Sequence, residues 1–301
     1  MKNLFYKYNI FHVIIAFLFI LDVLLIVFVY QNKDCKTNIN RVSFLDVGQG
    51  DAIYIENDKG QNILIDTGDK DSDVLNQIRE VENCSRVNID YLVLTHPDQD
   101  HIGEAYNLIS KGFVKKVIHN GFLDIDQPGE SQTENDLENI INTNHITKQN
   151  IVDLNTIDFP GFDIKVLFPW SKVYEGKDKK KDDNYYSIVM KVEKDQKSFL
   201  LTGDASMKSE RDILDKYCFK KKVCPELEVD VLKLGHHGSK TSSSYDFLKI
   251  VNATEYIVSA GKNNRYHHPS HETLDNINLL NKKDSHIRET SLEGNIVYVL
   301  D

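Results

Sequence analysis

The amino-terminal part of the chain has a different hydrophobic pattern from the rest. Residues 10–30 are almost all Ile, Leu, Val, Phe and Ala, and only His12 and Asp22 interrupt the run. At about 1.5 Å of rise per residue, a helix of this length just crosses a hydrocarbon core of roughly 30 Å. The run lacks the small residues of a cleavage site at its end, which favours an uncleaved membrane anchor over a cleaved signal peptide.

After a short polar stretch, apolar runs of strand length alternate with segments of helical spacing. In the first half the pattern predicts strands at 41–46, 52–56, 62–66, 91–95 and 115–118, helices at 74–81 and 106–110, and a helix with loops in the polar segment 124–150. In the second half it predicts strands at 162–168, 186–192, 198–202, 229–234, 256–259 and 296–300, and helices at 207–217, 245–251 and 272–280. Strands in each half with helices between them predict two packed sheets covered outside by helices.

The predicted organisation is an anchor at 1–31, a linker at 32–40 and one folded domain at 41–301. The basic residues on the two sides of the apolar run do not decide its orientation by the positive-inside rule. Single amino-terminal anchors commonly leave the following domain outside the cell. We therefore expect a single-pass protein of the cell membrane with an extracellular domain.

The charge balance limits the kinds of partner. The chain has a net charge of −10, and residues 1–31 hold two of its 36 basic and one of its 46 acidic side chains, so the remainder lies near −11. This balance argues against a sequence-reading nucleic-acid binder with a broad basic face. It does not exclude a phosphodiesterase, because bound metal supplies local positive charge. Cys218 and Cys224 bracket a basic turn, and both a small disulfide loop and two free thiols remain open.

The strongest chemical signal follows the predicted strand at 91–95. There His96, Asp98, Asp100 and His101 lie within six residues, on a turn that precedes a helix. Imidazole and carboxylate groups that converge in this way suit one divalent metal, or two metals with neighbouring ligands. The alternative is a solvated loop in which Asp100 only caps the helix.

Two later strands end in residues of the same kind. The run at 199–203 delivers Asp204, and the run at 229–234 delivers Gly235-His236-His237-Gly238-Ser239. Either motif alone would be an ordinary turn or a surface pair. Together with the first cluster they predict a metal site at one edge of the sheets.

The domain resembles the metallo-β-lactamase domain of ComEC-type competence proteins. The resemblance runs in order through almost all of the chain from Arg41 onward. It rests on Leu45-Asp46-Val47-Gly48-Gln49-Gly50-Asp51, Leu64-Ile65-Asp66-Thr67-Gly68, the cluster at His96 to His101, Asp183-Asn184, Ser187-Ile188-Val189, Leu201-Thr202-Gly203-Asp204, the segment from Leu234 to Ser239, Asn264-Arg265-Tyr266 and His268-Pro269. The multi-pass membrane channel of those proteins is not in this sequence, so we expect a stand-alone relative.

This resemblance implies an αββα sandwich with the site at one sheet edge, here preceded by the one transmembrane helix that the apolar run predicts, and it assigns roles to site residues. His96 and Asp98 would hold one metal, Asp100 and His101 would hold the second, and Asp204 would bridge them. One histidine of the pair would complete the second site; we favour His237, although the sequence does not decide between the two. The residues expected to surround and orient the ligands are Asp51, Asp66, His236 and Asn184.

The first metal site departs from the wider superfamily. Asp98 stands where a histidine is usual, and a further histidine is expected before the bridging carboxylate. Only His119 and His145 lie between His101 and Asp204, and neither has a matching context. A site rich in oxygen ligands favours Mn²⁺ beside Zn²⁺.

The expected mechanism is hydrolysis by a hydroxide that two divalent ions activate, with Asp100 or Asp204 holding the nucleophile. His268 is a candidate general acid or phosphate contact, or else caps the helix that begins near Glu272. Ser239 and Lys240, with the hydroxyls at 241–244, are candidate phosphate donors at a helix start, or an ordinary serine-rich cap.

We therefore expect a phosphodiesterase or nuclease related to DNA-uptake proteins. The alternatives are a hydrolase of cell-surface phosphoesters such as phosphocholine esters, and a non-catalytic metal-binding module. Its expected partners are a phosphodiester, which DNA would provide, and the membrane at residues 10–30, with no obligate protein partner. Affinity for long polyanions should be weak unless the Lys-rich segments at 179–181 and 220–222 line the approach.

Overall fold

The computed structural model of the chain describes residues 2–31, 39–84, 87–123, 131–170, 183–219, 223–280, 282 and 285–301. Its first helix, α1 (Lys2–Gln31), contains the apolar segment. The stretch Ile10–Val29 has a mean hydropathy of 3.0 and is fully exposed. Length and composition therefore suit a membrane span, although a signal sequence would have the same properties. The Lys-rich segments 179–181 and 220–222 lie outside the described residues.

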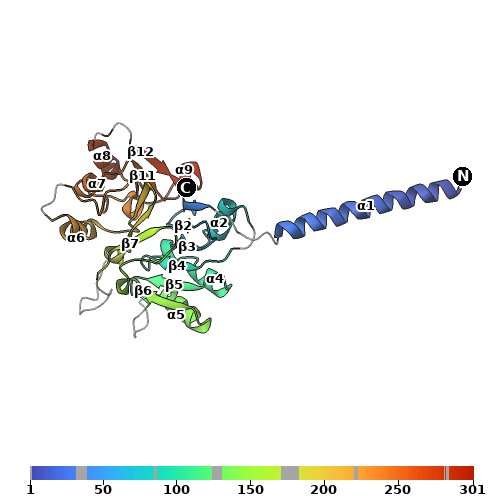
Figure 1. Cartoon of the computed structure of the whole chain (residues 1–301), viewed down its shortest axis with the longest axis horizontal. Coiled ribbons are helices and arrows are strands. Elements are labelled where there is room, and N and C mark those ends of the chain that lie inside the picture. The colour runs from blue at the N-terminus through green and yellow to red at the C-terminus, as the bar shows by residue number, and fades with distance from the viewer. Residues whose placement is uncertain are drawn as a thin grey trace.

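Two mixed sheets form the body of the domain (Figure 1). The first has the strand order β13 (Ile296–Leu300), β1 (Asn40–Phe44), β2 (Ile53–Glu56), β3 (Asn62–Ile65), β4 (Tyr91–Leu94), β5 (Lys116–His119) and β6 (Thr147–Asn150). The second has the order β12 (His286–Glu289), β11 (Glu255–Val258), β10 (Val231–Lys233), β9 (Lys197–Leu201), β8 (Val189–Lys194) and β7 (Asp163–Phe168).

Each sheet is antiparallel at one side and parallel at the other. Strands β3 to β6 run parallel in the first sheet, and strands β9 to β12 run parallel in the second. The carboxyl ends of parallel neighbours lie at one edge of their sheet, so the loops that follow them meet there. This arrangement brings the loops after β4, β9 and β10 to the site described below.

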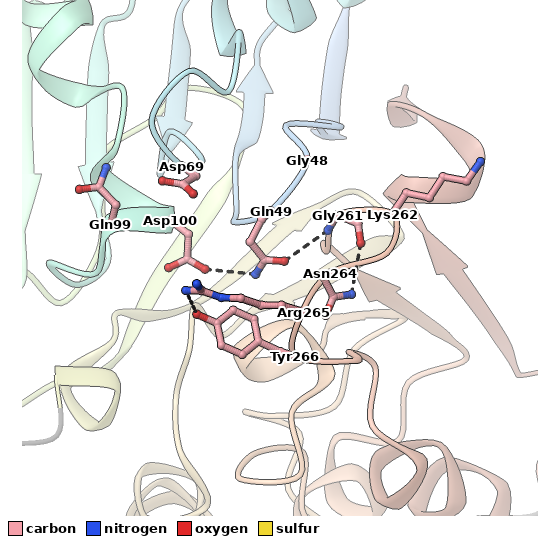
Figure 2. A pocket seen from close by; sticks show the side chains of 10 residues that line it. All are labelled: Gly48, Gln49, Asp69, Gln99, Asp100, Gly261, Lys262, Asn264, Arg265 and Tyr266. Atoms are coloured by element: carbon pink, nitrogen blue, oxygen red, sulfur yellow. Dashed lines mark hydrogen bonds between the residues drawn. The ribbon is translucent and has the colours of Figure 1, made fainter.

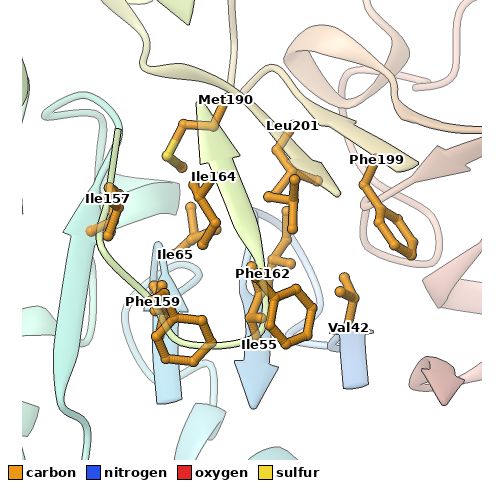
Figure 3. Close-up of a cluster of buried hydrophobic side chains, with 14 of the residues drawn as sticks. Val42, Ile55, Ile65, Ile157, Phe159, Phe162, Ile164, Met190, Phe199 and Leu201 are labelled. Atoms are coloured by element: carbon orange, nitrogen blue, oxygen red, sulfur yellow. The ribbon is translucent and has the colours of Figure 1, made fainter. Parts of the chain in front are cut away.

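The main core lies between the two sheets. Figure 3 shows Val42, Ile55 and Ile65 from the first sheet facing Met190 and Leu201 from the second. Within β2 the intervening Tyr54 points the other way and belongs to a different cluster. Both faces of these strands are buried, which explains why their sequences are continuous apolar runs rather than alternating ones.

Helices cover the outer face of each sheet. Apolar residues of α2 (Val74–Glu82), α4 (Ala105–Ser110) and α5 (Gln132–Thr143) pack on the first sheet. Those of α6 (Met207–Cys218), α7 (Tyr245–Val251) and α8 (His271–Leu279) pack on the second. The predicted αββα sandwich is therefore confirmed. Short elements complete the chain: α3 (Gln99–Ile102), α9 (Thr290–Glu293), η1 (Ile151–Asp153), η2 (Asp183–Tyr186) and η3 (Gly235–Gly238).

Several predicted boundaries were wrong. Strands β6 and β12 were not predicted, because they are short edge strands with largely exposed or half-buried polar residues. The strand expected at 186–192 begins only at Val189, since Asp183–Tyr186 forms a 3₁₀ turn. The strand expected at 229–234 is shorter, and the closing strand at 296–300 is present as predicted.

Candidate metal centre

The predicted ligands come together from both sheets. His96 and His101 follow β4 in the first sheet, Asp204 follows β9 and His237 follows β10 in the second. Ligand atoms of His96, His101 and Asp204 all lie within 4.8 Å of one another, and those of Asp100, His101 and His237 meet the same limit. Residues more than 130 positions apart in sequence thus form one cluster.

The loop after β4 presents its side chains to the cluster rather than to its own backbone. Asp98 is the N-cap residue of α3, yet its side chain makes no capping hydrogen bond. Asp100 and His101 follow on that short helix, and Asp100 Oδ2 accepts a hydrogen bond from Gln49 Nε2 at 3.2 Å. The loop also packs tightly, because a Cβ at Gly50 would lie 2.0 Å from the carbonyl oxygen of Asp100. The alternative of a simple capping loop therefore does not describe this segment.

Asp204 lies at the centre of the cluster. Its Oδ1 is 3.2 Å from His101 Nε2, and its Oδ2 is 3.9 Å from His96 Nε2, 3.6 Å from His236 Nε2 and 3.7 Å from His237 Nε2. Two further carboxylates lie next to these histidines: Asp98 Oδ2 is 3.6 Å from His96 Nε2, and Asp100 Oδ2 is 3.2 Å from His237 Nε2. A carboxylate this close to four imidazoles could be a ligand of more than one ion.

The inward-facing atoms lack the partners that buried polar groups normally have. Among the described residues, His96 Nε2, His101 Nε2 and Asp204 Oδ1 are buried without a partner in hydrogen-bond geometry. Leaving such atoms unsatisfied costs about 1–3 kcal/mol each. Nitrogen and oxygen donors that converge and remain unsatisfied fit a divalent metal ion.

Asp66 and Thr95 set the orientation of the first histidines. Asp66 Oδ1 accepts from the backbone N–H of Thr95 at 2.8 Å, and its Oδ2 accepts from the Thr95 hydroxyl at 2.7 Å and from His101 Nδ1 at 2.8 Å. The same hydroxyl lies 3.0 Å from His96 Nδ1. With Nδ1 protonated in both rings, Nε2 keeps its lone pair toward the cluster. Sequence analysis assigned an orienting role to Asp66 but none to Thr95, although Thr95 directly precedes the histidine motif.

Asp51 supports the opposite side of the cluster through a buried ion pair. Lys233 Nζ lies 2.6 Å from Asp51 Oδ2 and also donates to the carbonyl oxygen of Leu234. His237 Nδ1 donates to the carbonyl of Ser259 at 2.7 Å and lies 3.3 Å from Asp51 Oδ1, which leaves its Nε2 toward Asp100. Sequence analysis did not predict the role of Lys233. The one feature that could have indicated it is the position of a lysine inside an otherwise apolar strand.

Both histidines of the pair face Asp204. His236 and His237 have φ values of 49° and 56°, in the left-handed region that non-glycine residues seldom adopt. Both rings approach Oδ2 of Asp204 but differ in their other neighbours, because His237 reaches Asp100 whereas His236 lies near Asn184 (3.3 Å) and Thr241 (3.2 Å) through Nδ1. The favoured His237 is the one that groups with Asp100 and His101, and His236 also lies within 4 Å of Asp204. Asn184 contacts His236 in the orienting position expected for it.

The buried charges of the cluster stabilise one another. Burial would raise the pKa of Asp204, but the charges of His101 and His237 outweigh burial and hold this pKa well below its usual range. Burial would lower the pKa of His101, yet Asp204 and Asp66 raise it well above its ordinary value. In His237, burial is opposed chiefly by Asp204, and the pKa rises to about 9. The buried carboxylates thus favour positive charge at this place, which a divalent cation would supply with the Nε2 lone pairs facing it.

His268 lies beside the cluster but not among its ligands. Its ring centroid is 5.8 Å from that of His236, and burial followed by the charges of His236 and His237 lowers its pKa to about 4. A neutral ring at pH 7 can contact a substrate but is poorly suited to be a general acid. The alternative that His268 caps the next helix was wrong, because Ser270 is the N-cap of α8.

The hydroxyl-rich segment after the histidine pair mainly holds the fold together. Ser239 is buried and its Oγ contacts the Thr241 hydroxyl at 3.0 Å, while Lys240 is exposed. Ser244 caps α7 by accepting from the backbone N–H of Phe247. These contacts correspond to the serine-rich cap that sequence analysis kept as the alternative. Away from the site, the cysteine alternative is also decided, because Cys218 and Cys224 form a disulfide.

The two remaining histidines of this region do not join the cluster. His119 is buried at the end of β5, where its Nδ1 accepts from the backbone N–H of Gly121 at 3.1 Å. His145 is exposed on the turn before β6. Neither takes the place of the histidine that the wider superfamily has before the bridging carboxylate.

Comparison with known proteins agrees with this geometry. Residues 45–169 match the Metallo-beta-lactamase superfamily. ComE operon protein 3 of Bacillus subtilis is 31% identical over 294 residues, which cover 92% of this chain and 34% of that protein. Competence protein ComA of Neisseria gonorrhoeae is 29% identical over 241 residues, which cover 80% of this chain and 30% of that protein. The chain thus spans about a third of the length of these curated relatives.

Among solved structures, the metallo hydrolase Igni18 from Ignicoccus hospitalis superposes with a TM-score of 0.51 at 15% identity. The superposition covers 87% of this chain and 100% of that chain. At this identity the likeness concerns the fold alone.

Proposed function

Since this chain belongs to the metallo-beta-lactamase superfamily and is a metal-dependent hydrolase related to competence proteins, we propose that its substrate is a phosphodiester, either single-stranded DNA or a smaller ester of the same class. The observation that carries the proposal is the central position of Asp204, within 4 Å of four imidazoles that have two further carboxylates beside them. No Ser or Cys nucleophile is required by such a site.

We assign the ligands to two divalent ions that share Asp204. Asp100, His101 and His237 would hold one ion. His96 and Asp98 would hold the other, and His236 would supply the nitrogen that the usual histidine provides elsewhere in the superfamily. The assignment is supported by the separate carboxylate in each group, since Asp98 lies 3.6 Å from His96 and Asp100 lies 3.2 Å from His237.

Bound divalent ions supply the Lewis acidity that polarises a phosphodiester and lowers the pKa of water. The chain's own residues perform the remaining tasks. Asp100 and Asp204 carry carboxylate oxygens that can orient an attacking water, and Asp100 is the one of the two that is partly open to solvent. His268, neutral at pH 7, can donate a hydrogen bond to a substrate oxygen beside His236.

We propose Mn²⁺ as an activating ion together with Zn²⁺. Each group has two carboxylates beside its histidines, and carboxylate oxygens accept the harder ion. Asp98 is also the most exposed ligand, with 43% of its side chain accessible, so this ion should exchange more easily than the one held by buried His101 and His237.

We further propose that the domain lies outside the cell, anchored by α1. The Cys218–Cys224 disulfide supports an oxidising compartment, where such bonds persist. The apolar stretch Ile10–Val29 supports the anchor. The phosphodiester and the membrane are then the partners of this protein.

The experiment is a substrate panel on the full-length chain in detergent micelles, with Mn²⁺ and Zn²⁺ compared. The panel contains a fluorescein-labelled single-stranded oligonucleotide, bis(p-nitrophenyl) phosphate and p-nitrophenyl phosphocholine. We expect Mn²⁺-stimulated cleavage of the first two. Asp100→Asn should abolish cleavage, which a contaminating nuclease would survive, and Asp275→Asn on the exposed face of α8 is the matched control.

Three other outcomes would contradict the proposal. Cleavage of the choline ester alone, which is also a phosphodiester, would exclude DNA and move the substrate to cell-surface phosphocholine esters. Full metal occupancy without cleavage of any ester would leave a different hydrolase reaction or the non-catalytic metal-binding module. Failure to bind metal at all would contradict the metal centre itself.

A further inference from the structure

A pocket of about 560 Å³ opens directly beside the metal ligand Asp100. One wall comes from the loops that carry Gly48, Gln49, Asp69, Gln99 and Asp100, and the other from the loop after β11. Figure 2 shows Arg265 and Tyr266 of that second loop opposite Asp100. The volume lies within the range of about 300–1,000 Å³ that small-molecule sites occupy.

The loop after β11 is held firmly against the metal-binding side. Gln49 connects the two walls, because its Nε2 donates to Asp100 Oδ2 at 3.2 Å and its Oε1 accepts from the backbone N–H of Gly261 at 3.4 Å. Within the loop, Asn264 Nδ2 donates to the carbonyl of His268 at 2.8 Å, and Asn264 Oδ1 accepts from the N–H of His268 at 2.8 Å. The conformation that presents Arg265 and Tyr266 is therefore built in and does not require a ligand.

The two presented side chains are a cation and an aromatic ring. Tyr266 is 50% exposed, and the Arg265 guanidinium carbon lies 4.7 Å from its ring centroid. Arg265 donates to the Tyr266 hydroxyl, a neutral partner, and the carboxylates of Asp69 and Asp100 on the opposite wall attract it without a direct ion pair among the described residues. A phosphate would be a better partner for a guanidinium than a hydroxyl is. Lys262 also lines the pocket, but its side chain extends away from Arg265 in Figure 2.

The aromatic ring connects the pocket to the metal centre. Tyr266 stacks on His268 with ring centroids 5.7 Å apart and planes 15° apart, and His268 in turn contacts His236. A ligand that lies on Tyr266 is thus one side chain away from the residues that face Asp204. On the opposite wall Asp100 belongs to both the pocket and the metal cluster.

We propose that this pocket binds one nucleotide unit of a single-stranded nucleic acid, next to the phosphodiester that is cleaved. Its phosphate would draw Arg265 away from Tyr266, and its base would take the place of the guanidinium on the tyrosine ring. The proposal rests on the proposed function and narrows its substrate class. Bases within a duplex are stacked on one another, so only an unpaired base can lie on a tyrosine. For a chain with a net charge of −10, a local cation and a stacking ring are a more plausible basis for polyanion binding than overall charge.

A choline ester fits this pocket less well. Recognition of a quaternary ammonium uses aromatic faces free of other cations. Several aromatic rings form the cage for such a cation, whereas Tyr266, beside the Arg265 guanidinium, is the one aromatic residue among those that line this pocket. The same guanidinium is suited to the phosphate of a nucleotide.

The test is fluorescence anisotropy with a fluorescein-labelled single-stranded oligonucleotide and the full-length chain in detergent micelles. The measurement uses the Asp100→Asn background, so that the probe stays intact. An abasic oligonucleotide of equal length and a duplex serve as comparison probes. Tyr266→Leu and Arg265→Gln are the test variants, Tyr266→Phe is the conservative variant, and Tyr245→Leu and Arg211→Gln are exposed controls outside the pocket.

We expect Tyr266→Leu to weaken binding of the normal oligonucleotide at least fivefold and to leave the abasic probe unchanged, because one stacked base is lost. Tyr266→Phe should restore binding. Arg265→Gln should weaken both probes and reduce the dependence on salt. Equal binding of normal and abasic probes, preference for duplex, or no effect of Tyr266→Leu would each overturn the proposal.

Failure of this proposal can be told apart from failure of the proposed function. If wild type cleaves the oligonucleotide and both variants leave KM unchanged, the activity stands and the nucleotide pocket is wrong. If both variants weaken binding as expected while wild type cleaves no ester, the pocket stands and the activity is wrong.

Discussion

Asp66→Asn is the sharpest test of how the chain prepares its metal ligands. Asp66 touches no expected metal position, yet its two oxygens accept three hydrogen bonds, from the backbone N–H of Thr95, the Thr95 hydroxyl and His101 Nδ1. An asparagine of the same shape must turn an NH₂ group toward one of these donors. If the amide oxygen stays on the Thr95 N–H, the NH₂ group faces His101 Nδ1. That ring can then accept only by moving its proton to Nε2, the atom that should bind metal.

The expected loss follows from this tautomer change. Replacing a partner that orients a ligating histidine typically lowers metal affinity about 10- to 100-fold, or roughly 1.4–2.7 kcal/mol. Since the site is buried and His101 faces Asp204 at 3.2 Å, we expect the upper part of this range for the ion held by His101. The ligand set itself is unchanged, so the number of ions bound at saturation should stay as in wild type.

The assay is competition with a chromophoric chelator, using Zn²⁺ and Mn²⁺ on the full-length chain. Asp275→Asn, on the exposed face of α8, is the control for the loss of one negative charge. Thermal unfolding in the presence of a chelator shows whether the variant remains folded. Wild-type affinity in a folded Asp66→Asn protein would refute the reasoning, and so would a drop of equal size in the control.

Four further predictions follow from the same structure. Asp204→Ala should lose most bound metal by elemental analysis, whereas His145→Ala, an exposed control, should lose none. His236→Ala should lower the metal content by about one ion and leave the other in place, and retention of all metal would show that His236 is not a ligand. Through the apolar stretch Ile10–Val29, the full-length chain should stay in the membrane fraction during an alkaline wash, and native protein recovered in the medium without that stretch would show a cleaved signal instead. Burial raises the pKa of Glu82 from 4.5 to about 7, so the folded state keeps this proton to a higher pH than the unfolded state does. The free energy of unfolding should therefore fall by up to about 3 kcal/mol as the pH rises from about 4.5 to 7. Glu82→Gln should remove this pH dependence in thermal unfolding with a chelator present.

Local sequence patterns were sufficient for the parts of the site that lie close together in the chain. The motif from His96 to His101 could be recognised in the sequence as a candidate metal site, because histidines and carboxylates rarely cluster on one turn without a metal. Asp204 and the histidine pair were identified because each directly follows an apolar strand. The strands themselves were visible because burial on both faces makes them continuous apolar runs.

Other parts of the site depend on contacts between distant segments. The buried pair of Asp51 and Lys233 joins residues from two different sheets, and no local pattern pairs them. Gln49 meets Gly261 across 212 positions of sequence and thereby forms the pocket beside Asp100. The polar edge strands β6 and β12 were invisible for a related reason, because the backbone of a neighbouring strand, and not their own hydrophobicity, makes them strands.

The sequence by itself therefore indicated the apolar helix, most strands of the two series, the resemblance to the superfamily and the residues proposed as metal ligands, since neighbouring residues carry each of these signals. Only the tertiary structure decided that both His236 and His237 face Asp204, because the answer depends on two left-handed residues and on a carboxylate that follows another strand. It also decided that β13, at the end of the chain, pairs with β1 near its beginning and closes the first sheet. Strand pairing and ligand direction are set by the packing of two sheets, which no single stretch of sequence contains.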